Sequence, residues 1–119
     1  MAKPFALRSN DQFRPVVEEG WAPLLGTPNH PEYPSAHGCF TGALGYALAE
    51  LMGTTKIDLD VAATNGGVPR HYTWRDDLLA EVGEARIWGG LHYRTSVEVG
   101  LRIGQRVVAY NLHRNFRPA

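Results

Sequence analysis

The chain has 119 residues, of which 44% are hydrophobic and 20% are charged, so it can form at most one small globular domain. Its formal net charge of zero excludes a global field that would recruit nucleic acid or an anionic membrane surface. The single Cys39 excludes an intrachain disulfide and a cysteine-based zinc site. No stretch is apolar enough to span a bilayer, and the N-terminus has no signal-peptide core, so we expect a soluble chain without an export signal.

Residues 1–34 are rich in proline, with six of the eight prolines of the chain. Such density disrupts regular structure, and the segment also carries apolar residues such as Phe13 and Trp21 that favour packing over disorder. We therefore expect an extended arm over residues 1–34, followed by a helical oxyanion-binding domain over residues 35–119.

The first helix is predicted from Ser35 or His37 to Met52, with Gly53 as its stop. Its apolar residues recur at helical spacing: Phe40, Leu44, Leu48 and Leu51. Another face carries only small residues, which would let a second helix approach closely: Gly42, Gly45 and Ala49. Residues 56–61 alternate in the manner of a strand, but the sequence shows no partner for it.

Two further helices complete the predicted architecture. The second should begin at Thr73, which forms a capping-box-like start with Asp76, and should end near Trp88, before the break at Gly89 and Gly90. Its expected apolar stripe is Trp74, Leu78, Val82 and Ala85. The third should run from Thr95 or Ser96 to about Leu112, burying Val97, Leu101, Gly104 and Val108. The fold class is therefore mostly α, with about three core helices and an arm.

Two segments place chemistry-bearing residues together. In the first, Ser35, Ala36 and His37 put a hydroxyl, free amides and an imidazole at a helix N-terminus, where anions bind readily. In the second, Arg86 precedes His92 across a glycine hinge, and arginine suits tetrahedral oxyanions. A purely structural interpretation is equally open for each segment: Ser35 as a helix cap, and Arg86 as a partner of helix carbonyls.

The other three histidines, His30, His71 and His113, lie in loops or at a helix end, and a solvated or locally bonded role is the stronger hypothesis for them. A helical zinc pair is not favoured, because His37 and His92 lack the short spacing that such a pair needs.

Together the two segments resemble known motifs. Pro34-Ser35-Ala36-His37, followed by Arg86-x5-His92, is similar to the second and third signature motifs of the vanadium-dependent haloperoxidase and type 2 phosphatidic acid phosphatase superfamily. The stretches over residues 29–34 and 85–94 look like its soluble bacterial haloperoxidase-related branch. The resemblance covers about residues 21–118. It implies a fold like the C-terminal catalytic half of the haloperoxidase and acid phosphatase helical bundle.

The resemblance also implies roles for the site residues. His92 would be the phosphoryl-accepting nucleophile, or the axial ligand of vanadate in a haloperoxidase, and His37 would be the general acid for the leaving group. Oxygens of the anion would be held by Arg86, by Ser35 and by the Ala36 amide. The implied small molecules are phosphate esters, or a halide and peroxide with vanadate as cofactor.

The sequence departs from the family pattern in three places. Alanine stands at position 36, where glycine is usual, and Ala85 replaces a serine that often precedes the motif arginine. The first motif, K-x6-R-P, is not intact: Arg14-Pro15 can supply its end and Arg14 is a candidate anion ligand, but Leu7 falls at the lysine position. The family fold also has helices before the second motif for which this chain has no room.

Two functional hypotheses follow. The first is an oxyanion-site enzyme, either a phosphatase or a haloperoxidase. The second is a non-catalytic helical module that retains the family core and dimerises through the small-residue face of the first helix. In both cases we expect a homo-oligomer or a missing N-terminal half, because three helices leave an apolar core partly uncovered.

Overall fold

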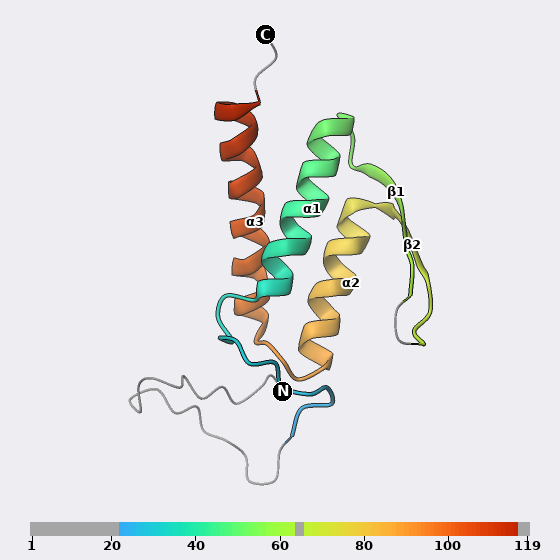
Figure 1. The fold of residues 1–119 in the computed structure, drawn as a ribbon, viewed down its shortest axis with the longest axis vertical. Coiled ribbons are helices and arrows are strands. Elements are labelled where there is room, and N and C mark those ends of the chain that lie inside the picture. Colours follow the sequence, from blue (N-terminus) through green and yellow to red (C-terminus); the bar gives the residue numbers. More distant parts are fainter. Residues whose placement is uncertain (1–21, 64–65, 117–119) are drawn as a thin grey trace.

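The computed structural model describes residues 22–63 and 66–116. Its elements are α1 (Ala36–Met52), β1 (Lys56–Val61), β2 (Arg70–Trp74), α2 (Arg75–Trp88) and α3 (Arg94–Asn115). The three helices lie side by side with α1 in the middle, and the hairpin flanks α2 on the side away from α3 (Figure 1). The predicted three-helix, mostly α architecture is confirmed. Of the predicted arm, residues 1–21 lie outside the described residues, and residues 22–34 are irregular.

Glycines bring the backbones of α1 and α3 into direct contact. A Cβ atom added to Gly42 on α1 would lie 2.8 Å from the carbonyl oxygen of Leu101 on α3. A Cβ added to Gly104 on α3 would overlap the Ala43 amide nitrogen and the Cys39 carbonyl oxygen of α1. The close approach of a second helix to the small-residue face is therefore confirmed, and no side chain separates the two helices at these positions.

The apolar stripe of α1, by contrast, largely faces away from the neighbouring helices. Phe40 is 78% exposed and Leu51 is 74% exposed, whereas Gly42, Gly45 and Ala49 are buried inside the chain. The predicted dimer contact through the small-residue face is therefore wrong. The physical reason is that small residues let whole backbones meet, which creates many dispersion contacts and leaves larger side chains outside the seam.

The strand expected over residues 56–61 exists and has a partner. β1 pairs antiparallel with β2, with Leu59 opposite Tyr72 and Asp60 opposite His71. The small core at this end contains Ile57, Tyr72 and Leu78, with Leu48, Leu59 and Val82 packed against it. The hairpin thus covers part of the apolar surface of α1 and α2.

The predicted start of the second helix at Thr73 is wrong. Thr73 belongs to β2, and α2 begins at Arg75 with Trp74 as a cap that makes no side-chain hydrogen bond. The pairing of Thr73 and its neighbours with β1 keeps them extended. Two members of the predicted stripe, Trp74 and Ala85, are also exposed.

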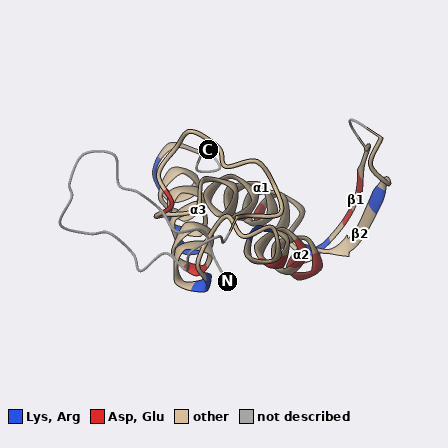
Figure 2. Cartoon of the chain, turned by 90° about the horizontal axis from the view of Figure 1, so that it is seen from below, with Lys and Arg blue, Asp and Glu red and all other residues tan. Residues whose placement is uncertain are grey.

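The two segments with candidate site residues, 35–37 and 86–92, lie at the same end of the bundle. The start of α1, the end of α2 and the start of α3 lie together at the lower end in Figure 1, and the view from that end shows charges of both signs spread over the helices and the hairpin (Figure 2). Among the described residues, none of the helices combines the length and apolar character needed to cross a bilayer.

Candidate functional site

The start of α1 is fixed on α3 by backbone contacts. Ser35 is the N-cap of α1, where its Oγ accepts a hydrogen bond from the Gly38 amide at 3.2 Å, as the structural interpretation expected. Its own amide donates to the Ser96 carbonyl on α3 at 3.0 Å, and its side chain is fully buried. The first helical residue is Ala36, so the Ala36 and His37 amides, which precede the capped Gly38 amide, lack intrahelical acceptors and favour an anion.

The end of α2 brings His92 back against Arg86. The amides of Leu91 and His92 donate to the Arg86 carbonyl oxygen at 3.0 and 3.3 Å. Gly90 has a φ of 73°, a left-handed conformation that glycine adopts without the strain of a side chain. The glycine hinge therefore folds the chain back at the end of the helix, and it leaves His92 fully buried.

Glu32 holds the His92 ring from the other side. His92 Nδ1 lies 2.6 Å from the carbonyl oxygen of Glu32, which can only accept, so Nδ1 donates. The Glu32 carboxylate accepts from the Tyr93 amide at 2.8 Å. In the neutral ring, Nε2 then carries the free lone pair. Sequence reasoning missed Glu32, because its contacts join residues about sixty positions apart.

Three buried nitrogen atoms in this region have no hydrogen-bond partner within the described residues: Arg86 Nε, Arg86 Nη2 and His92 Nε2. A buried polar group without a partner costs about 1–3 kcal/mol, so such groups are rare unless a ligand satisfies them. The two arginine atoms are donors, and the imidazole nitrogen offers a lone pair. An anion with a central atom that accepts a nitrogen ligand would satisfy all three.

His30 also lies close to His37 and His92, and we call these three histidines with Arg86 the cluster. Its ring stacks on that of His92 with centroids 6.1 Å apart, and its centroid lies 6.4 Å from that of His37. The expected local bond is present, because His30 Nδ1 lies 3.0 Å from the Pro31 carbonyl oxygen, but the ring is not simply solvated. The available signal was its place in the 29–34 stretch that carries the family resemblance.

The electrostatics of the cluster disfavour additional positive charge. Burial, with the nearby Arg86, His30 and His92, lowers the pKa of His37 below its ordinary value of 6.5. Burial is also the main cause of the lowered pKa of His92, which Glu32 partly opposes. Burial lowers the pKa of Arg86, although a guanidinium stays charged at neutral pH. The site thus combines a partly buried guanidinium with two imidazoles, those of His37 and His92, whose neutral forms are favoured.

These shifts predict a loss of stability in acid. A histidine whose folded pKa lies below its unfolded value binds protons more readily when unfolded, so its contribution to stability is present above pH 6.5 and falls as the pH drops through the folded pKa. We expect the free energy of unfolding to decrease from pH 7.5 to pH 5 in urea titrations. His37→Asn should reduce that decrease. Equal slopes in the wild type and in His37→Asn would contradict the prediction.

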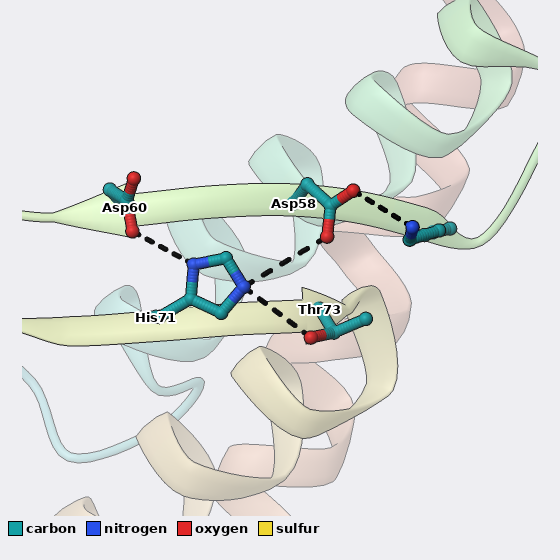
Figure 3. Close-up of polar contacts among 5 residues, drawn as sticks. Asp58, Asp60, His71 and Thr73 are labelled. Carbon is teal, nitrogen blue, oxygen red and sulfur yellow. Dashed lines mark hydrogen bonds and ion pairs between the residues drawn. The ribbon is translucent and has the colours of Figure 1, made fainter.

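The remaining histidines lie elsewhere. His71 on β2 is exposed, with Nδ1 2.8 Å from Asp60 and Nε2 3.9 Å from Asp58, so its predicted local role is confirmed (Figure 3). His113 lies in the last turn of α3. Within the described ranges, no three histidine, cysteine or acidic side chains are grouped to hold a metal ion.

The first family motif has no counterpart in the described site. Arg14 lies outside the described residues. Lys56 is on β1 and pairs with Asp58 at 3.1 Å, away from the cluster. The cationic part of the described site is therefore Arg86.

With the geometry in place, comparisons with known proteins identify the family. Residues 5–117 match the family described as the VCPO second helical-bundle domain. The chain belongs to the vanadium haloperoxidase superfamily. Among solved structures, it is similar to a bacterial vanadium-dependent iodoperoxidase, with a TM-score of 0.71 and 30% sequence identity over 78% of this chain. It also shares the fold of a bacterial vanadium-dependent chloroperoxidase, with a TM-score of 0.62 and 24% identity over 76% of this chain.

The chain spans only part of these superfamily members. It covers 23% of the iodoperoxidase chain and 22% of the chloroperoxidase chain. No curated protein sequence matches it. The superfamily and the helical-bundle fold are thereby shown.

Proposed function

We propose that this haloperoxidase-like chain binds a tetrahedral oxyanion, vanadate, between the start of α1 and the end of α2, and that it takes part in vanadate-dependent halide oxidation. The observation that carries the proposal is the set of three buried, unpartnered nitrogen atoms on Arg86 and His92. The names of the similar solved proteins, an iodoperoxidase and a chloroperoxidase, support vanadate as the anion.

The residues present fit vanadate. Arg86 would donate two hydrogen bonds to its oxygens, and the first-turn amides at Ala36 and His37 would add further donors. His92 Nε2 would be the nitrogen ligand, since its Nδ1 is committed to Glu32. When bound, vanadate would supply the centre at which hydrogen peroxide oxidises a halide ion. The protein would position the anion, neutralise its charge and exchange protons through His37.

The same arrangement supports phosphomonoester hydrolysis as the second candidate. Phosphate has the same shape, so His92 Nε2 could attack phosphorus while His37 protonates the leaving alcohol oxygen, after which water would release phosphate from His92. The lowered pKa of His37 makes it a strong acid once charged, and an anion beside it would offset the repulsion from Arg86. A non-catalytic module is not favoured, because it gives the unpartnered atoms no role.

Vanadate binding tests the proposal directly. Titration of the chain with orthovanadate, followed by calorimetry and by vanadium NMR, should give saturable binding that inorganic phosphate displaces. Bromide or iodide oxidation with hydrogen peroxide, and nitrophenyl phosphate hydrolysis, then separate the two candidate activities. If neither vanadate nor phosphate binds, both candidate activities are wrong.

Arg86 provides a sharper test. Arg86→Ala should weaken vanadate and phosphate binding roughly ten- to hundredfold, because hydrogen bonds to charged groups contribute about 1.5–3 kcal/mol. The matched control is Arg94→Ala at the same end of the bundle, because Arg94 is exposed and paired with Glu84 at 2.6 Å. Unchanged affinity in Arg86→Ala, or an equal loss in the Arg94 variant, would contradict the assignment.

The proposal also includes association. Helices α1 and α3 carry exposed apolar side chains, which water solvates poorly. Among them are Phe40 and Leu51 on α1 and Val107 and Tyr110 on α3. A second copy of the chain or additional helices of a longer haloperoxidase would cover this apolar surface. The small-residue face is not part of this surface.

A further inference from the structure

Glu32 makes contacts that a loop residue does not need for its own conformation. Glu32 as a whole is 7% exposed, although the residues on both sides of it are exposed. Its carbonyl oxygen and its carboxylate both bind the segment of His92 and Tyr93. A buried carboxylate normally carries a cost in lost hydration, so its placement against a site histidine calls for a reason.

We propose that Glu32 is a positioning residue that holds the His92 ring with Nδ1 protonated and Nε2 directed at the bound oxyanion. This proposal rests on the proposed function, and it adds the contact that decides which nitrogen of the His92 ring faces the anion. Two contacts carry it: the 2.6 Å bond from His92 Nδ1 to the Glu32 carbonyl oxygen and the 2.8 Å bond from the Tyr93 amide to the Glu32 carboxylate.

The two bonds act together. The bond to the carbonyl fixes which nitrogen is protonated, because a carbonyl oxygen cannot donate. That bond requires the 30–34 loop to stay against His92, and the hydrogen bond from the Tyr93 amide to the carboxylate helps to tie the loop there. The carboxylate also lies 3.5 Å from His92 Nδ1, a favourable position beside an N–H group. Partners of this kind fix the orientation of a ligating histidine, and their loss typically weakens binding 10- to 100-fold.

The test compares three variants with the intact chain. Glu32→Ala removes the tie between the loop and Tyr93. Glu32→Gln keeps an oxygen that accepts from the Tyr93 amide and removes only the charge. Glu84→Ala is the matched control, since Glu84 is a carboxylate at the same end of the bundle that pairs with Arg94 rather than with His92.

Two readouts are needed for each variant. The first is the ¹⁵N NMR pattern of the His92 ring without any anion, at a pH where the ring is neutral, because it reports directly which nitrogen is protonated. The second is the dissociation constant for orthovanadate. Circular dichroism melts establish that each variant is folded at the temperature used.

The expected result is a ring protonated at Nδ1 in the wild type and in the Glu84→Ala variant. Glu32→Ala should show a mixture of ring forms and a 10- to 100-fold weaker affinity for vanadate. Glu32→Gln should retain the wild-type ring form with an intermediate affinity. A purely structural Glu32 would lower only the melting temperature of Glu32→Ala and leave both readouts unchanged, which would overturn the proposal.

The outcomes separate this inference from the proposed function. If the wild type fails to bind vanadate, the proposed function fails, and the ring pattern in Glu32→Ala still decides whether Glu32 positions His92. If the wild type binds vanadate and Glu32→Ala binds equally well with an unchanged ring, the function stands and the inference is wrong.

Discussion

Replacement of His92 by alanine should abolish turnover of whichever substrate the chain accepts. The imidazole would be the nucleophile in phosphate ester hydrolysis or the nitrogen ligand of vanadate in halide oxidation, and no other described ring offers a buried, unpartnered Nε2. Loss of a nucleophile typically reduces kcat by several orders of magnitude, and we expect at least about a thousandfold. Steady-state rates with bromide and peroxide, and with nitrophenyl phosphate, measure the effect.

His37→Ala is the control for this prediction. It should retain vanadate affinity better than His92→Ala, because only His92 would bond the metal directly. It should also spare an activated ester with a nitrophenolate leaving group more than an alkyl phosphate, since nitrophenolate leaves without a proton. Wild-type affinity and wild-type turnover in His92→Ala would show that the assignment is wrong and would restore the non-catalytic module as the better account.

Gly104→Ala should produce the largest loss of stability among conservative single substitutions. Its Cβ would overlap the Ala43 amide and the Cys39 carbonyl, which are backbone atoms that cannot rotate away. Overpacking of this kind typically costs 1–3 kcal/mol and sometimes more, and we expect about 3 kcal/mol despite the better helix propensity of alanine. Urea titration followed by circular dichroism gives the free energy of unfolding.

Gly83→Ala on α2 is the matched control, because its Cβ would meet only a methyl group of the Val97 side chain, at 3.1 Å. A single methyl group 3.1 Å away has to move by only a few tenths of an ångström, whereas backbone atoms of another helix would overlap Cβ at Gly104, so the loss should be much smaller. Equal stability of the two variants would mean that α1 and α3 are not in backbone contact at Gly104.

The positions of the helices could be predicted from the sequence because their ends are marked locally. Ser35 caps α1, Gly53 ends it and Gly90 turns the chain after α2. The faces through which the helices pack against one another could not be predicted in the same way. Periodicity identified Phe40 and Leu51 as a stripe, but it does not show whether a neighbour contacts the large or the small residues of a helix.

The candidate site was partly predictable for a similar reason. His37, Arg86 and His92 stand in motifs that can be read from a few consecutive residues. Glu32 and His30 reach the candidate site through contacts with His92 across the fold. Their residue types and spacing alone do not reveal a role. Thr73 shows the opposite error, because a sequence pattern typical of a helix cap proved to be a strand once Tyr72 and its neighbours paired with β1.

The glycine contact between α1 and α3 also limits how this site can change in evolution. A Cβ on Gly100 would lie 2.5 Å from the Ser35 carbonyl oxygen, so the N-cap of α1 sits directly against the backbone of α3. Substitutions that change the shape of the candidate site are therefore expected in the connecting segments over residues 22–34 and 89–93 rather than at Gly100.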